Sequence, residues 1–319
     1  MSKKAFAVKT KDPDILKRSS SGGAFSLFAE EIIKDGGSVF GAKWEDCFTS
    51  VVLSEAVTDS EVSALCGSKY LRADISDSFD TAQKRLEDGK KVLFSATPCQ
   101  IAALKKKIPE NLQENLYTVD FICHGTPKNE IWREYLFARE KDAESMAQSV
   151  SFRNKDEGWR KYAINIEFEN GKIYRRRAAE DPYLRGYVSN LFLNDGCYNC
   201  PFKGNYKSDI TIGDFWGAEK HCGMDPEMGI SVVVCNTEKG LSLLEKVDAE
   251  KPSVDFDSAF LSNPSYYTPS VKSVLGSDFL KTAKKRGADA ALEKYAFPKL
   301  PVRIKRKILM TFRRKNEHK

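Results

Sequence analysis

The sequence predicts an α/β protein, with a mixed, largely parallel sheet as its core, helices on the faces of that sheet, an antiparallel hairpin and a helical C-terminal region. Three observations predict this class. Short apolar runs alternate with amphipathic helical patterns over residues 24–122, which is typical of parallel strands joined by helices. Asn170-Gly171 separates two runs of alternating apolar residues, a strong hairpin signal. Helical patterns return beyond residue 275.

The predicted elements follow one another in this order. The first clear helix lies in "GGAFSLFAEEIIKDGG", where one face carries Phe25, Phe28, Ala29, Ile32 and Ile33. We then expect strands at 38–44 and 49–57, a helix near 77–88, a strand at 91–95, a helix near 100–107 and a strand at 116–122. After the hairpin of 161–177 we expect a helix at about 181–193, strands at 208–216 and 230–237, a helix from about 237, and irregular chain over about 250–275.

The composition is that of an ordinary globular protein. Of the 319 residues, 41% are hydrophobic and 30% are charged. No apolar run approaches the roughly 18 residues of a membrane-spanning helix, and the first residues lack the apolar core of a signal peptide. We therefore expect an intracellular, cytoplasmic protein. The length suffices for two domains, or for one large α/β unit with an appendage.

Positive charge is concentrated at the C-terminus. The formal charge is +6, but residues 303–319 hold eight Lys or Arg against one Glu, so the other 302 residues sum to about −1. The body is not basic, and we expect no nucleic-acid partner. Ile304, Ile308 and Phe312 recur every four residues in this tail, which would give a helix an apolar stripe. The tail could lie on the inner face of an anionic membrane, contact an acidic partner, or be a solvated terminus.

The eight cysteines require a chemical explanation. A reducing compartment argues against a disulfide framework. Cys99 and Cys123 each end a predicted strand and precede a predicted helix, and the carboxyl ends of neighbouring parallel strands open into one crevice. Cys197 and Cys200 form a C-x-x-C pair whose sulfurs can face one metal centre. Together these residues supply the four thiols that a 4Fe-4S cluster requires.

Three alternatives compete with an iron-sulfur cluster. A thioredoxin-like redox pair should open a helix, whereas Pro201 and polar, loop-like residues follow Cys200. Cys99 and Cys123 could each be a packed core residue. A structural zinc could use the same four thiols.

Zinc could also bind Cys197 and Cys200 together with His221 and Cys222. His124, beside Cys123, could hydrogen-bond to a cluster, move a proton, or be purely structural. The other four cysteines neither end a predicted strand before a helix nor belong to a C-x-x-C pair. We expect Cys235 to be a buried strand residue, and no role is assigned to Cys47, Cys66 and Cys222.

Three short segments could contact the phosphates or the ring of a nucleotide cofactor. In "RSSSGGAF", hydroxyls and unobstructed backbone N–H groups stand at a predicted helix start, where the helix dipole favours anions. Simple N-capping by Ser20 or Ser21 accounts for the same residues. "GSKYLR" and "FRNK" offer cations for phosphate and an aromatic ring for stacking. No Walker A lysine or strand-bound G-x-G-x-x-G accompanies them.

Taken in order, "SSSGGAF", "GSKY", "VLFSATPCQIAAL", "VDFICHGTP", "FRNKDEGW", "CYNCPFK" and "DITIGDFWG" resemble the coenzyme F420 hydrogenase/dehydrogenase beta-subunit family, from about residue 4 to 245. The order of the motifs is specific, although no single motif is. Members of this family are iron-sulfur flavoproteins that pass electrons between ferredoxin-type clusters and FAD, and onward to a deazaflavin or another two-electron acceptor.

The resemblance implies a set of site residues and a division of the chain. It implies that a 4Fe-4S cluster is held by Cys99, Cys123, Cys197 and Cys200. It implies FAD contacts at Ser20, Ser21, Gly22, Gly23, Ser68, Lys69, Tyr70, Arg153 and Lys155, and it leaves Asp214 of "GDFWG" without a derived role. Residues 1–95 are then an α/β part that contributes to flavin binding, 96–250 the iron-sulfur and flavin catalytic part, and 251–319 an irregular and helical extension with the basic tail.

The chain also departs from the family pattern. Many relatives begin with a ferredoxin-like segment carrying two C-x-x-C-x-x-C-x-x-x-C-P runs, and this chain starts after that point. We therefore expect electrons from a separate ferredoxin-type carrier or subunit. Where relatives often read "GTPCQ" and "GSKYVQS", this chain has Ala96 and Ala73. Related proteins occur in organisms without deazaflavin, so the expected small-molecule acceptor is coenzyme F420 or another compound.

Two other functions are compatible with these motifs. One is a non-catalytic electron-transfer or scaffold subunit that keeps the cluster and has lost flavin or substrate binding. The other is a zinc-stabilised binding module. An oxidoreductase predicts a flavin and cluster absorbance, a scaffold subunit predicts a cluster spectrum alone, and a zinc module predicts a colourless protein.

Overall fold

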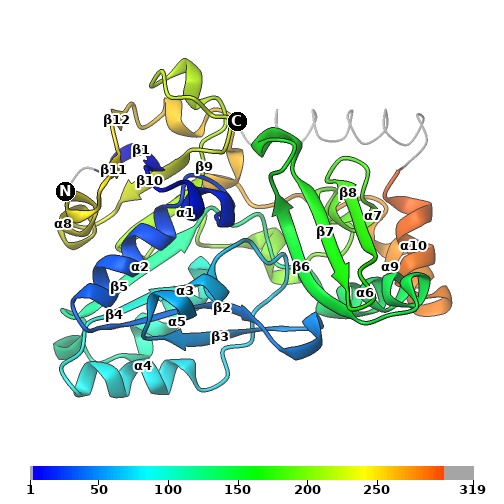
Figure 1. Ribbon diagram of the computed structural model, residues 1–319, viewed down its shortest axis with the longest axis horizontal. Helices are drawn as coiled ribbons and strands as arrows, with labels where there is room; N and C mark the ends of the chain where they lie inside the picture. Colours follow the sequence, from blue (N-terminus) through cyan, green and yellow to red (C-terminus); the bar gives the residue numbers. More distant parts are fainter. Residues whose placement is uncertain (1–2, 298–319) are drawn as a thin grey trace.

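The computed structural model describes residues 3–297 (Figure 1). The apolar stripe expected at Ile304, Ile308 and Phe312 lies outside these residues. One sheet of nine strands forms the larger part of the molecule, and a separate sheet of three strands stands beside it, next to the C-terminal helices. The predicted α/β class is confirmed.

The large sheet is mixed. Its strands are β1 (Lys4–Thr10), β2 (Ser38–Trp44), β3 (Val51–Ala56), β4 (Val92–Ser95), β5 (Leu116–Phe121), β9 (Ile210–Asp214), β10 (Ser231–Cys235), β11 (Ala249–Glu250) and β12 (Ser253–Val254). Their order is β11-β1-β10-β9-β5-β4-β2-β3, and β12 also pairs with β1. Within residues 3–297 the parallel strand pairs are β2 with β4, β4 with β5 and β5 with β9, at the centre of the sheet. Direct pairing of β4 with β5 brings together the two strands that lead to Cys99 and Cys123.

Alternating side chains of the large sheet enter different hydrophobic cores. Val39 and Leu93 pack under α2 (Ala24–Lys34), α3 (Asp59–Leu65) and α8 (Glu238–Lys246). Their neighbours Phe40 and Phe94 point to the opposite face, which α4 (Ser78–Glu87) and α5 (Pro98–Lys107) cover. Near β1 and β10 that opposite face is covered by residues from 206–266. Both faces are buried, as the continuous apolar runs of the central strands predict.

The small sheet contains the predicted hairpin. Its strands are β6 (Ala147–Asn154), β7 (Ala163–Phe168) and β8 (Ile173–Arg177), in the order β6-β7-β8. The turn between β7 and β8 contains Gly171, whose φ of +81° only glycine adopts without strain. Beside this sheet lie α6 (Asn129–Ala143), α7 (Pro182–Val188), α9 (Gly276–Arg286) and α10 (Ala288–Tyr295) (Figure 1).

Some elements carry no clear sequence signal. The short helix α1 (Pro13–Arg18) has too few residues for a periodic pattern, and its start is fixed by the Asp12 carboxylate, which accepts from the backbone N–H of Asp14 and Ile15. Strand β6 is largely polar, "AQSVSFRN", so its apolar alternation is weak. The helix expected at 181–193 ends at Val188 because Asn190 has a left-handed φ of +58°.

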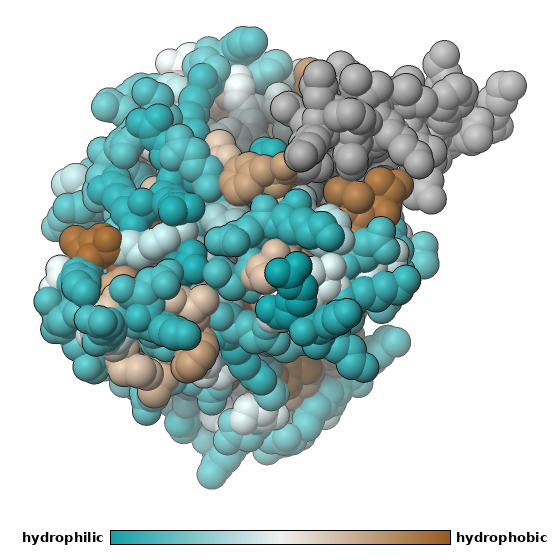
Figure 2. All heavy atoms as spheres, turned by 90° about the vertical axis from the view of Figure 1, so that its right-hand side faces the viewer, coloured by the Kyte–Doolittle hydropathy of each residue, from teal (hydrophilic) through white to brown (hydrophobic). Residues whose placement is uncertain are grey.

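The side of the molecule that carries the small sheet and the C-terminal helices is mostly hydrophilic. Figure 2 shows this face, where the hydrophobic side chains, in brown, form small separate patches among hydrophilic residues, in teal. Among residues 3–297, no helix is long and apolar enough to span a bilayer.

Candidate functional site

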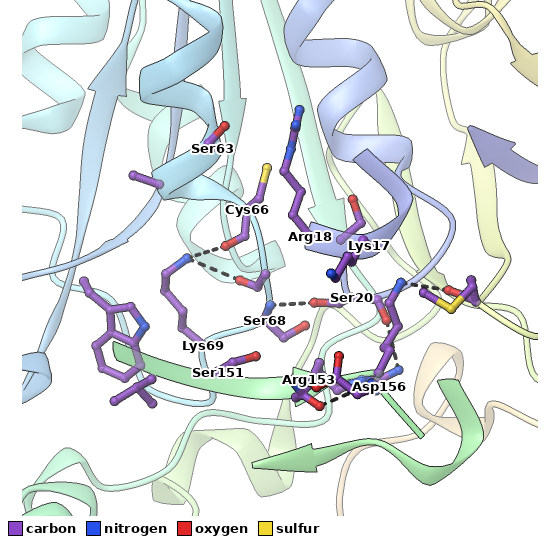
Figure 3. A pocket seen from close by; sticks show the side chains of 18 residues that line it. Lys17, Arg18, Ser20, Ser63, Cys66, Ser68, Lys69, Ser151, Arg153 and Asp156 are labelled. Carbon is purple, nitrogen blue, oxygen red and sulfur yellow. Dashed lines mark hydrogen bonds between the residues drawn. The ribbon is translucent and has the colours of Figure 1, made fainter. Parts of the chain in front are cut away.

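A cavity of about 530 Å³ lies between the two sheets. One wall comes from the C-terminal end of α1 and the serine segment after it, a second from the loop after α3, and a third from β6. Figure 3 shows these three segments around the cavity. Its volume is within the range of pockets that hold small molecules or cofactors. Of the predicted flavin contacts, five line it: Ser20, Ser68, Lys69, Arg153 and Lys155.

Arg153 joins four of the sequence motifs at the floor of this cavity. Its Nη1 donates to Asp214 Oδ2 at 2.9 Å and to the Tyr70 hydroxyl at 3.4 Å, and its Nη2 donates to the Ser20 carbonyl at 3.2 Å. The guanidinium also lies 4.0 Å from the ring centre of Tyr162. Burial is the largest single influence and opposes the charge of Arg153, but Asp214, Tyr70 and Tyr162 together outweigh it, so the pKa of Arg153 lies above its usual value. Asp214 therefore acts as the counter-ion of Arg153.

A stacked tryptophan pair supports the same serine segment. Trp159 and Trp216 have ring centres 4.1 Å apart with planes at 13°. The Trp159 indole N–H donates to the Ser20 carbonyl at 3.2 Å. This carbonyl therefore accepts from both Trp159 and Arg153, which fixes the backbone at the edge of the cavity.

Two lysines predicted to meet phosphate are bound to the protein backbone instead. Lys155 Nζ donates to the carbonyls of Leu16, Ser21 and Met228 at 2.6, 3.3 and 2.7 Å. Burial, followed by the charge of Arg153, lowers the pKa of Lys155 to about 8.

Lys69 Nζ is held in a similar way. It donates to the carbonyls of Leu65, Cys66 and Gly67 at 3.4, 2.9 and 3.3 Å, at the C-terminal end of α3. Figure 3 draws the bonds to the carbonyls of Cys66 and Gly67. Burial lowers the pKa of Lys69 to about 8. Both lysines thus satisfy carbonyl groups and hold the cavity walls together.

The glycine-rich start of α2 packs against the large sheet. A Cβ on Gly22 would lie 2.1 Å from the Val8 carbonyl, and Gly23 has a φ of +89° at the N-cap of α2. The Ser21 hydroxyl donates to the Ile230 carbonyl at 2.8 Å, and the Ser20 hydroxyl accepts from the backbone N–H of Ser68 at 2.6 Å.

N-capping of α2 by Ser20 or Ser21 is therefore wrong, because Gly23 occupies the cap and both hydroxyls have other partners. Ser21, Gly22 and Gly23 lie behind the cavity wall, and Tyr70 reaches the cavity through Arg153.

Several cavity residues were missed by sequence reasoning. They are Lys17, Arg18, Trp44, Ser151 and Asn154. The run of basic residues and serines in "LKRSSS" is the only signal near Lys17, and it becomes meaningful once β6 is known to lie opposite. Cys66, left without a role, also lines the cavity, with its sulfur 3.2 Å from the Ser26 hydroxyl.

Cys99 and Cys123 lie at the predicted edge of the sheet. Cys99 is in the first turn of α5, directly after β4, and is exposed to solvent, with its sulfur 3.2 Å from the Thr97 hydroxyl. Cys123 follows β5 and is half-buried. Burial, opposed mainly by the charge of Lys203 and reinforced by Cys197 and Cys99, raises the pKa of Cys123 to about 12. Both cysteines and the first of the C-x-x-C pair therefore lie within electrostatic reach of one another.

The C-x-x-C segment packs against the chain that follows Cys123. Cys197 belongs to a short 3-10 turn, Asp195–Asn199, and its sulfur accepts from the Thr126 backbone N–H at 3.3 Å. A Cβ on Gly125 would lie 3.2 Å from Cys197 Cβ, so glycine permits this approach.

Lys203 lies among three of the thiols. Its Nζ donates to the carbonyl of Cys123 and, at 2.7 Å, to that of Ser265. Burial lowers the pKa of Lys203, while Cys123, Cys200 and Cys197 raise it, in that order. A cation in this position suits a group of thiolates.

The thiols do not form a binding group for a single metal ion. Across residues 3–297, no set of three or more His, Cys, Asp or Glu side chains has that geometry. Cys222, proposed as a zinc ligand, instead donates to the Ala218 carbonyl at 3.1 Å, and His221 lies parallel to the ring of Phe215. The donor chemistry at the sheet edge suits an iron-sulfur cluster, because thiols are its usual ligands and N–H donors to sulfur stabilise it.

A pair of tyrosines connects the cysteine region with the cavity. Tyr187 donates to the Gly125 carbonyl at 2.8 Å, and its ring stacks on Tyr70 with centres 5.0 Å apart. Tyr70 in turn contacts Arg153. His124 lies on the other side of Tyr187, with ring centres 5.1 Å apart, and its Nε2 is 2.6 Å from Asn190 Oδ1. Burial lowers the pKa of His124, which favours a neutral, structural ring.

Comparison with known proteins gives two findings. A family model for the C-terminal part of the beta subunit of coenzyme F420 hydrogenase/dehydrogenase matches residues 89–254. A chain of the F420-reducing [NiFe] hydrogenase complex from Methanosarcina barkeri has a similar structure, with a TM-score of 0.54 and 16% sequence identity over 91% of this chain and 90% of that chain. At this identity the structural similarity concerns the fold alone.

Proposed function

The chain belongs to the coenzyme F420 hydrogenase/dehydrogenase beta-subunit family, and from this premise we propose that it is an FAD- and 4Fe-4S-dependent oxidoreductase. It passes electrons between a ferredoxin-type carrier or partner subunit and a two-electron acceptor, either the deazaflavin coenzyme F420 or another small molecule. Membership of the family supports a redox role. The cofactors, the partner and the acceptor are the parts that we propose.

One observation carries the proposal most directly. Cys99 and Cys123 follow two paired parallel strands, and the backbone after Cys123 donates to the sulfur of Cys197. Cys123 also interacts electrostatically with Cys197 and Cys99, so thiols from separate parts of the chain lie near one another, and thiols are the usual ligands of an iron-sulfur cluster. We propose that Cys99, Cys123, Cys197 and Cys200 hold one 4Fe-4S cluster, which supplies one-electron transfer when bound.

The cavity supports the flavin part of the proposal. It is large enough for part of a dinucleotide, and most of the charged side chains that line it are basic. Ser20, Ser68 and Arg153 line the side of the cavity that connects, through the Tyr70–Tyr187 pair, to the cysteine region. Lys69 and Lys155 fix the walls, and Ser21, Gly22 and Gly23 bring α2 against the sheet behind them. Bound flavin would convert single electrons into a hydride equivalent.

In this proposal the side chains at the site hold its shape, and none of them forms or breaks a bond with the substrate. Asp214 keeps Arg153 charged and in place, and the Ser20 carbonyl is fixed by two donors. We propose no side chain as a nucleophile or as a proton donor. In this function residues 1–95 contribute to flavin binding, 96–250 form the iron-sulfur and flavin part, and 251–319 form an extension with the basic tail. We further propose a cytoplasmic location, with the tail available for an anionic membrane face or an acidic partner.

Anaerobic purification followed by absorbance spectroscopy and assays for FAD, iron, sulfide and zinc tests this function. We expect flavin bands above a broad cluster absorbance, both bleached by dithionite, and recovery of the flavin bands on adding an electron acceptor. A cluster spectrum without flavin would instead indicate an electron-transfer or scaffold subunit. A colourless protein that contains zinc would overturn the redox function.

A further inference from the structure

The cations that line the cavity are of two kinds. Five basic side chains line it, from Lys17, Arg18, Lys69, Arg153 and Lys155, against one acidic side chain. That acid, Asp156, is already paired with Arg175 at 3.1 Å. The cavity therefore has a surplus of positive charge, which favours an anionic ligand.

Three of these cations are already committed to the protein. Lys69 and Lys155 each donate to three backbone carbonyls, and Arg153 donates to Asp214, Tyr70 and the Ser20 carbonyl. Turning any of them toward a ligand would leave buried acceptors unpaired, which costs more than one new hydrogen bond gains. These three side chains therefore attract an anionic ligand through their positive charge, without a direct hydrogen bond to it.

The remaining two cations are free to contact a ligand. The Lys17 ammonium group makes no hydrogen bond or ion pair with any other side chain or carbonyl of residues 3–297. Arg18 has only Glu30, at 3.9 Å. Both are exposed and stand at the end of α1. In Figure 3, Lys17 lies beside Ser20, on the other side of the cavity from Lys69. The hydroxyls of Ser68 and Ser151 also lack protein partners within the described part of the chain.

We propose that Lys17, assisted by Arg18, is the residue that contacts the diphosphate of a nucleotide cofactor, and that Lys69 and Lys155 serve as structural ties of the cavity wall. This assignment rests on the proposed flavin site, and it gives Lys69 and Lys155, which the motifs suggested as phosphate contacts, a structural role instead. Trp44, from the end of β2, also lines the cavity and offers a flat apolar surface for a ring. The diphosphate and the ring of the ligand are therefore recognised by different residues.

Binding of three probes to the apoprotein separates recognition of the diphosphate from recognition of the ring. FAD, ADP and riboflavin are titrated against the full chain by fluorescence or calorimetry. Lys17→Ala should weaken FAD and ADP by about 10- to 100-fold, the loss of one charge-assisted hydrogen bond. Riboflavin, which has no phosphate, should bind the variant as it binds the wild type. Lys17→Arg should retain most of the affinity for FAD, because it keeps the charge.

A matched control removes a lysine outside the cavity. Lys11 is exposed and pairs with Asp248, so Lys11→Ala makes the same change in net charge and should leave all three affinities unchanged. Equal binding of FAD and ADP to wild type and Lys17→Ala would overturn the assignment while leaving the flavin function intact. Binding of ADP that depends on Lys17, without binding of FAD, would support the diphosphate contact and contradict the flavin. A wild-type protein that binds neither nucleotide would overturn both.

Discussion

The ion pair between Arg153 and Asp214 should determine both the stability of the fold and the shape of the cavity. Arg153 Nη1 lies 2.9 Å from Asp214 Oδ2, and their side chains are 5% and 20% exposed. Asp214→Asn keeps the size of the side chain and an oxygen acceptor but removes its charge. The substitution therefore leaves a buried guanidinium without a counter-ion, while the hydrogen bond itself can persist.

The size of the effect follows from these contacts. Removing one partner of a buried ion pair completely costs about 3–5 kcal/mol. A hydrogen bond to a charged group contributes about 1.5–3 kcal/mol against about 0.5–1.5 for a neutral one. Because asparagine can still accept a hydrogen bond from the guanidinium, Asp214→Asn removes only the charge of the acceptor, and we expect it to lower the free energy of unfolding by about 1–2 kcal/mol. Flavin affinity should fall by up to about tenfold, since about 1.4 kcal/mol corresponds to a factor of ten.

Urea unfolding followed by tryptophan fluorescence measures the change, because the stacked pair of Trp159 and Trp216 lies beside Arg153. Glu157→Gln is the matched control. It neutralises a carboxylate that pairs with Arg177 on the same side of the fold, where both side chains are more than two-fifths exposed. The control should unfold like the wild type. Equal stability of Asp214→Asn, Glu157→Gln and wild type would refute the role of Asp214 as the counter-ion.

Three further predictions concern groups that are buried around the site. Burial raises the pKa of Asp120 to about 7, so the native state keeps a proton that the unfolded chain loses above about pH 4. The contribution of Asp120 to stability should then fall by up to about 4 kcal/mol as the pH rises from about 4 to about 7. Thermal unfolding of wild type and Asp120→Asn across this range should therefore show the wild type losing stability relative to the variant, and parallel pH profiles would contradict it. Gly22→Ala places a Cβ 2.1 Å from the Val8 carbonyl and should cost about 1–3 kcal/mol or more in chemical unfolding; an unchanged midpoint would show that the segment can move aside. Lys155→Met leaves three backbone carbonyls without their donor and should cost about 1–3 kcal/mol, with unaltered unfolding as the opposing result.

The sequence contains most of the information on the sheet edge. The apolar runs before Cys99 and Cys123 predict two parallel strands, and β4 and β5 are neighbours as expected. Adjacent parallel strands place their carboxyl ends side by side for any conformation of the loops that follow. The neighbouring positions of Cys99 and Cys123 therefore follow from the local strand patterns. The hairpin at Asn170-Gly171 was predictable for the same reason, because the turn sequence alone determines it.

The cavity could not be predicted in this way. Arg153 lies in a strand with weak alternation, and its counter-ion is 61 positions further along the chain. A lysine beside an arginine in "FRNK" suggests a phosphate contact, but Lys155 is bound to carbonyls 139, 134 and 73 positions away. Which cations are free is a property of tertiary packing. It depends on where α1, the loop after α3 and β6 meet, and no local pattern specifies that.

Iron content is the most direct test of the cluster that we propose at the sheet edge. The protein is purified anaerobically as wild type, as Cys197→Ser and as Cys47→Ser, the last replacing an exposed cysteine that the proposal leaves unused. Wild type and Cys47→Ser should each contain about four iron and four sulfide per chain, and Cys197→Ser should lose most of both. Full iron and sulfide in Cys197→Ser, or none in the wild type, would contradict the proposal.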